Sequence, residues 1–197
     1  MRVLILFIAI VLTYTDQTMA QEKEYFKYSE NGELINIPSS TSSKDDFNFL
    51  IGNWTVQNRK LITRLKNSND WNEFEAKWKI NPILDRLGNI ENYYATLGDK
   101  PFEGVALRFF DQKTKLWSIY WSDINSTGIL QAPITGSFYG DLGIFYMKDR
   151  FNNKEILVKY EWDKSDLNHP TWRQGVSLDD GKTWEWNWYM TGTKVEE

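Results

Sequence analysis

The chain has 197 residues, a formal net charge of −4, no cysteine and a single histidine. Without cysteine, thiol catalysis, disulfides and cysteine-ligated zinc sites are excluded. No basic block exceeds two adjacent residues, so the sequence predicts no nucleic-acid partner. The 10 Trp, 10 Tyr and 11 Phe predict a sizeable core, because each ring brings a large buried area.

Residues 1–20 have the pattern of a secretory signal peptide. Met1-Arg2 is a short positive start, residues 3–12 are an apolar run, and Thr18 and Ala20 are small residues before a cleavage point. The alternative is a buried N-terminal strand. An apolar run of about ten residues is too short to cross a bilayer, which takes about 20. We therefore expect cleavage after Ala20, no stable membrane span in the mature chain, and a periplasmic or secreted protein.

Residues 21–44 are polar and rich in Ser and Glu, which predicts a leader or linker that is partly disordered. Ser42-Ser43, followed by three charged residues, is a helix N-cap pattern. Residues 47–51 then form one short apolar face that ends at Gly52. The sequence predicts a short helix of one or two turns here, at the start of a single domain over residues 45–197.

From Gly52 onward the hydrophobic period changes to two. In residues 73–80, Phe, Ala, Trp and Ile alternate with Glu and Lys, which is the pattern of a half-buried strand with a charged outer face. Residues 156–162 alternate in the same way, and Gly, Asn and Asp turn signals separate the further candidate strands. About nine or ten short strands predict an all-β domain, either a closed antiparallel up-and-down β-barrel or a strongly curved sheet, since closure removes exposed edges.

The segment SLDDGKTWEWNW, residues 177–188, predicts a hairpin. Strand residues 172–177 lead into a turn in which Gly181 supplies a positive φ. The return strand is expected to place Trp184, Trp186, Trp188 and Met190 on one face. Eight residues of the segment, Ser-x-Asp-x-Gly-x-Thr-Trp, resemble the Asp-box of sialidases. That resemblance implies the turn geometry and not the glycosidase activity, because the chain is too short for a six-bladed propeller.

Gly52-Asn53-Trp54, at the start of the first long strand, resembles the G-x-W opening of lipocalins. This resemblance implies that Trp54 closes one barrel end and that a basic residue of the last strand, here Lys194, packs on it. With the wider pattern FNFLIGNW, LRFFD…LWSIYWSD and WRQGVSLDDGKTWEWNW, residues 47–193 resemble the calycin-like domains of uncharacterised exported bacterial proteins. That family resemblance implies a lipocalin-like barrel and no particular function.

The sequence contains no complete catalytic or metal-binding motif. His169 is the only imidazole, and no G-x-S-x-G elbow accompanies it; its place before Pro170 predicts a loop. Gly181-Lys182-Thr183 lacks the upstream glycine of a phosphate loop. Residues 163–166 lack EF-hand spacing, so a solvated turn is favoured over a calcium site. We therefore predict no metal and no cofactor, and whether the protein is an enzyme stays open, with a non-enzyme favoured.

A barrel of this size can hold one small ligand in its interior. Such pockets are mostly apolar with a few placed polar groups, so polar residues on apolar strands and their aromatic neighbours are the candidates. The predicted ligand-binding residues are Trp78, Asn92, Tyr94, Arg108, Trp121, Gln174, Glu185 and Asn187. The competing interpretation is a solvent-facing position for each polar residue and plain core packing for each aromatic one.

Three functions are consistent with this pattern. The first is an exported barrel that binds a small, partly apolar or aromatic ligand in its interior. The second is a partner-interaction or structural protein that uses an aromatic surface. The third, by analogy with other barrels, is a carboxylate-dependent isomerase or lyase acting on a small polar metabolite, with Glu185 and Arg108 as its nominal pair.

Overall fold

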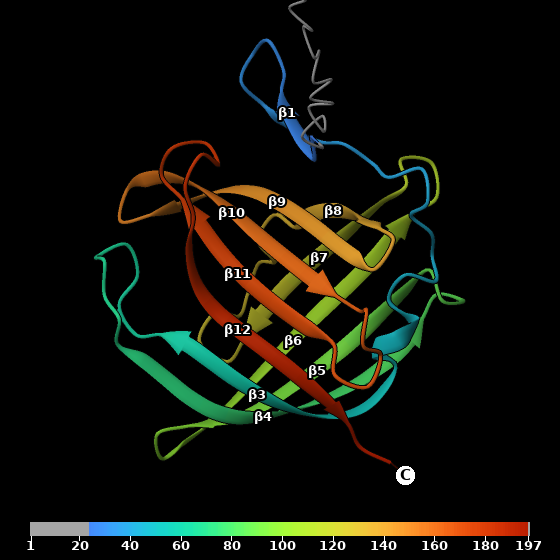
Figure 1. Cartoon of the computed structure of the whole chain (residues 1–197). Helices are drawn as coiled ribbons and strands as arrows, with labels where there is room; N and C mark the ends of the chain where they lie inside the picture. The colour runs from blue at the N-terminus through green and yellow to red at the C-terminus, as the bar shows by residue number, and fades with distance from the viewer. Residues whose placement is uncertain (1–23, 197) are drawn as a thin grey trace, which may run out of the picture.

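The computed structural model describes residues 24–196, which form a closed ten-stranded antiparallel barrel and a separate two-stranded hairpin (Figure 1). Each barrel strand pairs with the next along the chain, and the last pairs with the first. The all-β, up-and-down barrel predicted from the two-residue period is therefore confirmed. The strands are β3 (Gly52–Leu61), β4 (Trp71–Ile83), β5 (Gly88–Leu97), β6 (Lys100–Asp111), β7 (Leu116–Asp123), β8 (Ile134–Tyr139), β9 (Leu142–Phe151), β10 (Lys154–Asp163), β11 (Thr171–Ser177) and β12 (Glu185–Lys194).

The expected signal peptide, residues 1–20, lies outside the described residues. Between residues 24 and 196, no helix has the length and apolar character needed to cross a membrane.

A single 3-10 turn, η1 (Asn48–Leu50), stands where the sequence predicts a short helix. Phe47, at the N-cap position of this turn, makes no side-chain capping hydrogen bond. The Ser42 hydroxyl and the Ser43 backbone N–H instead both donate to Oδ2 of Asp46, at 2.9 and 2.8 Å. The two serines that look like helix caps in the sequence therefore fix an irregular turn around one buried carboxylate.

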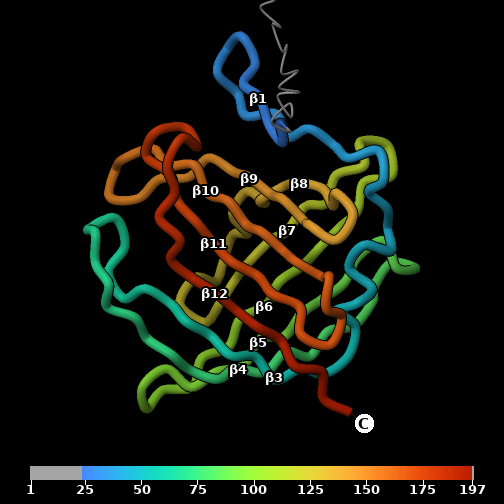
Figure 2. The backbone as a smooth tube through the Cα atoms, viewed as in Figure 1, coloured from blue at the N-terminus to red at the C-terminus, as the bar shows by residue number. Residues whose placement is uncertain are grey.

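Residues 39–51 close one end of the barrel, after the chain has run down its side from the hairpin (Figure 2). Phe47 is buried and meets the rings of Trp117 and Phe138 edge-on, each at a centroid distance of 4.9 Å. The indole N–H of Trp54 donates to the carbonyl of Leu50 at 2.7 Å. Aromatic packing therefore fills this end, and the hollow part of the barrel lies toward the opposite end.

Trp54 and Lys194 make the contact that the G-x-W resemblance implies. They lie opposite each other on β3 and β12, and Nζ of Lys194 is 5.6 Å from the centroid of the Trp54 ring. Trp54 itself is buried at the closed end.

The inner faces of the strands follow the predicted alternation. On β4, Ala76, Trp78 and Ile80 are buried, while Lys77 and Lys79 between them are exposed. On β7, the face with Trp117 points inward. A period of two with one buried face thus sets which side chains can reach the barrel interior.

β12 departs from this alternation at Asn187. Gln174 of β11 pairs with Trp188, but the next residue of β11 pairs with Trp186, so Asn187 is the extra residue of a β-bulge. Trp188 faces the interior, whereas Trp186 faces outward, where the Arg173 guanidinium lies 3.9 Å from its ring. The prediction that the tryptophans of this strand share one face is wrong, because the bulge reverses the side on which successive residues point.

The hairpin turn before β12 has the expected polar geometry. Asp179 accepts hydrogen bonds from the backbone N–H of Thr183 at 2.9 Å and from its hydroxyl at 2.7 Å. These bonds stabilise the carboxylate, which lowers the pKa of Asp179 to about 2. Gly181 has φ of 88°, so the predicted positive φ is confirmed.

A second hairpin, which the sequence did not predict, covers the outside of the barrel at this turn. It consists of β1 (Phe26–Tyr28) and β2 (Leu34–Asn36). The Tyr28 hydroxyl donates to Oδ1 of Asp180 at 2.9 Å, and Phe26 packs on Tyr146 at 4.6 Å between ring centroids. Part of the polar leader therefore shields aromatic side chains on the barrel exterior.

Candidate functional site

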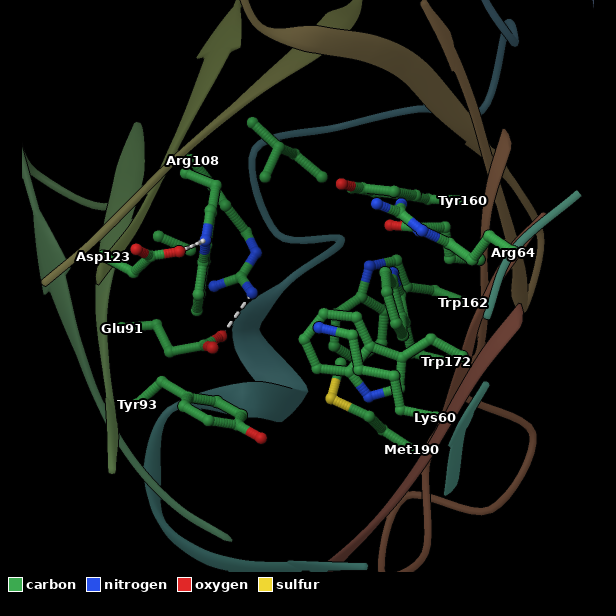
Figure 3. A pocket seen from close by; sticks show the side chains of 15 residues that line it. Lys60, Arg64, Glu91, Tyr93, Arg108, Asp123, Tyr160, Trp162, Trp172 and Met190 are labelled. Carbon is green, nitrogen blue, oxygen red and sulfur yellow. Dashed lines mark hydrogen bonds and ion pairs between the residues drawn. The ribbon is translucent and has the colours of Figure 1, made fainter. Parts of the chain in front are cut away.

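A cavity of about 330 Å³ lies inside the barrel (Figure 3). At the ~30 Å³ that a water occupies in the liquid, this volume equals roughly 11 waters, and it falls at the small end of ligand pockets. Seven of the ten barrel strands, all except β4, β8 and β9, contribute lining residues. The space therefore suits one small molecule.

Aromatic side chains form most of one wall. Trp172 meets Tyr160 edge-on at 4.9 Å and Trp188 at 5.5 Å between ring centroids. Trp162 and Met190 complete this wall, as Figure 3 shows. Flat, rigid rings of this kind give a large apolar contact area at low conformational cost.

A buried ion pair between Arg108 and Glu91 lies at the inner end of the cavity. The side chains of both residues are only 4% exposed. Nη1 of Arg108 also donates to Oδ1 of Asn89 at 2.9 Å, and the guanidinium lies 5.2 Å from the ring of Phe47 in the closed end. Among the described residues, Nε of Arg108 has no hydrogen-bond partner. Glu91 therefore neutralises the arginine, and one donor stays unsatisfied.

Two further cations, Lys60 and Arg64, line the cavity on the wall opposite Arg108 and Glu91 (Figure 3). Nζ of Lys60 lies 3.7 Å from the centroid of the Trp188 ring. Within residues 24–196, neither cation forms an ion pair. Burial, reinforced by the charge of Arg64, lowers the pKa of Lys60 to about 8.

Asp123 is the second carboxylate of the cavity, and neutral donors hold it. The indole N–H of Trp121 donates to Oδ2 at 3.1 Å, and the backbone N–H of Asn125 donates to Oδ1 at 2.9 Å. The charge of Asp123 acts on Lys60 through space and raises its pKa, but more weakly than burial lowers it.

A buried amide ties three strands together beside the cavity. Oδ1 of Asn58 accepts from the Tyr93 hydroxyl and from the Trp188 indole N–H, both at 3.0 Å. Burial and the charge of Glu91 raise the pKa of Tyr93, so the phenol stays neutral and remains a donor. This network fixes the orientation of two aromatic lining residues.

Three of the eight predicted site residues, Arg108, Trp121 and Gln174, line the cavity. Trp78 also faces the interior, but it lies in the core, 5.9 Å from the Trp162 ring, and does not line the cavity. The inward orientation of these four side chains follows from the two-residue alternation of β4, β6, β7 and β11.

Asn92 and Tyr94 lie on the outer face of β5, because Glu91 and Tyr93 occupy its inner face. Tyr94 is 43% exposed. The expectation that these two residues point into the pocket is therefore wrong, and the neighbouring positions supply the polar groups instead.

Glu185 and Asn187 do not line the cavity, and each forms a hydrogen bond with another residue instead. Both oxygens of Glu185 accept the backbone N–H of Leu65 at 2.8 Å. Oδ1 of Asn187 accepts from Nε2 of Gln174 at 2.9 Å and so orients that amide. The nominal pair of Glu185 with Arg108 is not formed, because the partner of Arg108 is Glu91.

Sequence reasoning missed Lys60, Arg64 and Glu91. Glu91 lies on the same face of β5 as Asn89 and Tyr93. The two-residue alternation, with that face turned inward, would have predicted its position. Lys60 follows Val56 and Asn58 on the inner face of β3, where a cation does not fit the apolar pattern, and Arg64 lies in the loop after that strand. His169, as predicted, lies in a loop, where it is exposed beside Asp166.

No protein-family model matches the chain, and a search of curated proteins found no similar one. The function is therefore inferred from the cavity itself.

Proposed function

We propose that the barrel binds one small, partly apolar or aromatic molecule in its interior. The observation that carries this proposal is an internal cavity of about 330 Å³ whose walls combine tryptophan rings with a few fixed polar groups. Pockets of known ligand-binding proteins have this composition. The fixed polar groups include the Arg108–Glu91 ion pair and the amide of Gln174, all of which line the cavity.

The two other candidate functions have weaker support. The isomerase or lyase hypothesis needs Glu185 to act with Arg108, whereas both oxygens of Glu185 accept the backbone N–H of Leu65. A partner surface would need exposed aromatic side chains. Trp184 and Trp186 do face outward, but the β1–β2 hairpin and the side chains of Lys159 and Arg173 cover them.

We infer that the barrel acts in the periplasm or outside the cell and belongs with calycin-like exported proteins. The signal-peptide pattern of residues 1–20 supports the first inference, and the Trp54–Lys194 contact in a closed barrel supports the second. Lipocalin barrels have eight strands, so ten strands favour the wider group over the lipocalins themselves. Mass measurement of the exported protein should give a mature chain that starts at Gln21.

A cavity-filling variant tests the binding proposal. Ala106 lines the cavity, so Ala106→Phe places a ring inside it, whereas Thr96→Phe adds the same ring at an exposed position. We expect a member of a lipid, sugar, haem and aromatic-metabolite panel to change the tryptophan fluorescence of the wild type and of Thr96→Phe, but not of Ala106→Phe. Thermal unfolding checks that both variants fold. Equal binding by Ala106→Phe, or no binding by any compound, would overturn the proposal.

A further inference from the structure

We propose that the ligand is a monoanion, a carboxylate on an aromatic or apolar body, and that Lys60 and Arg64 bind its charged group. This inference depends on the proposed interior binding site and adds the chemical class of its ligand. It follows from the charges of the cavity, from two cations that form no ion pair with a described residue, and from the way the loop that bears Arg64 is held.

The charges that line the cavity do not cancel. Three cationic side chains, Lys60, Arg64 and Arg108, face two carboxylates, Glu91 and Asp123, which leaves one positive charge. Arg108 is neutralised by direct contact with Glu91. The excess charge therefore belongs to the wall with Lys60 and Arg64, and one anionic group of a ligand would balance it.

Within residues 24–196, Lys60 and Arg64 form no ion pair. A partly buried ammonium without a counter-ion is costly, and the Trp188 ring at 3.7 Å offsets only part of that cost. Arg64 lies over the ring of Phe151, with its guanidinium carbon 4.8 Å from the ring centroid. In the described part of the chain these two are the cavity cations that form no ion pair, and both contact aromatic rings. A carboxylate between them would form charge-assisted hydrogen bonds with both.

The position of Arg64 is built into the fold. Leu65, its neighbour, has φ of 57° and donates its backbone N–H to both oxygens of Glu185. Glu185 is thus a positioning residue that holds the loop with Arg64 beside the cavity. In Figure 3 the two cations extend into the cavity from one wall, while Glu91 and Asp123 occupy the other. A ligand carboxylate is therefore attracted to the first wall and repelled by the second.

A matched pair of compounds isolates the charge. 1-Naphthoate and its neutral amide, 1-naphthamide, have nearly the same shape, and calorimetric titration of the full chain at pH 7 measures both affinities. We expect the acid to bind at least about tenfold more tightly, which corresponds to about 1.4 kcal/mol. This preference should shrink between pH 7 and pH 9 as Lys60 loses its proton, while the affinity of the amide stays constant.

Variants assign the preference to the two cations. Lys60→Met should reduce the ratio of the two affinities to about one, Arg64→Met should lower it, and Lys60→Arg should retain it. Lys79→Met, which removes the same charge from the exposed face of β4, should leave it unchanged. Thermal unfolding verifies that each variant is folded.

The outcomes separate this inference from the proposed function. Equal binding of acid and amide by the wild type, or an undiminished preference in Lys60→Met, overturns the anion inference and leaves interior binding intact. Acid binding that persists in Ala106→Phe places the site outside the cavity and overturns the inference as well. Failure of both naphthyl compounds to bind overturns it too, and the wider ligand panel then decides the proposed function separately.

Discussion

The carboxylate of Glu185 accepts the backbone N–H of Leu65 with both of its oxygens, across 120 residues of sequence. Leu65 has φ of 57°, a conformation that residues other than glycine adopt at a cost. One side chain at the start of β12 thereby fixes the loop between β3 and β4. Because Arg64 precedes Leu65, this bond also determines where a cation of the cavity lies.

Glu185→Ala should loosen this loop without touching the ligand. Hydrogen bonds to a charged group contribute about 1.5–3 kcal/mol, so we expect the free energy of unfolding in urea to fall by about that amount or less. The affinity for 1-naphthoate should fall severalfold, and that for 1-naphthamide should change little. Glu185→Gln keeps an acceptor oxygen and should recover most of both losses. A Glu185→Ala protein with wild-type stability and affinity would show that the loop needs no such anchor.

Arg108→Met should destabilise the barrel strongly, because it leaves Glu91 charged and unpaired in the interior. Breaking a buried ion pair in this way costs about 3–5 kcal/mol, whereas replacing both partners is often neutral. The double variant Arg108→Met/Glu91→Leu should therefore recover most of the stability in guanidinium unfolding. The exposed pair of Arg150 and Glu155, 3.6 Å apart, is the control: Arg150→Met should change the stability by less than about 1 kcal/mol. A small effect of Arg108→Met alone would contradict this account.

The strands could be predicted because their inner faces follow a two-residue hydrophobic period. On β4 the apolar residues alternate with charged ones, and a one-residue shift in register would expose the entire apolar set. The hairpin turn before β12 was predictable for a different reason: Asp179 and Gly181 satisfy a local geometry that needs no distant partner. The turn residues and the two-residue hydrophobic period were therefore sufficient to predict an antiparallel barrel.

The site was less predictable because it depends on register and on one inserted residue. The run around Asn187 keeps an unbroken alternation of Trp and polar residues, so nothing in it marks the bulge that turns Trp186 outward. The pairing of Arg108 with Glu91 follows from the register of β5 on β6, which a single strand does not specify. Lys60 shares the inner face of β3 with Val56 and Asn58, but its charge favours a solvent-facing position when one strand is considered alone.

Gly104→Ala should disturb the cavity wall. An added Cβ at Gly104 would lie 2.4 Å from two atoms of the Trp121 ring, so the indole must move and lose its bond to Asp123. We expect a loss of about 1–3 kcal/mol in the free energy of unfolding, as for other overpacked sites, and a shift in tryptophan emission. Gly104→Ala/Trp121→Phe, with a smaller ring, should recover stability. An unchanged emission spectrum in the single variant would show that the ring does not cover this glycine.

The low pKa of Lys60 should give the stability of the protein a distinct dependence on pH. The pKa is about 8 in the folded chain and 10.5 for the unperturbed amine, because burial disfavours the charged form. Between these values the unfolded chain binds more protons than the folded one, so the free energy of unfolding rises with pH. Between pH 7.5 and pH 9.5, Lys60 alone should raise the free energy of unfolding by about 2 kcal/mol.

Urea unfolding of the wild type and of Lys60→Met across this window tests the prediction. The variant has no amine at this position, so its stability should rise by about 2 kcal/mol less than that of the wild type. The window ends below pH 10 because the pKa values of Tyr28, Tyr139 and Tyr160 are raised to about 12. Above pH 10 these tyrosines stay protonated in the folded chain but lose their protons in the unfolded chain, so the stability of the protein falls there. Lys79→Met should follow the wild type, and parallel curves for the wild type and Lys60→Met would mean that Lys60 is solvated as an ordinary surface amine.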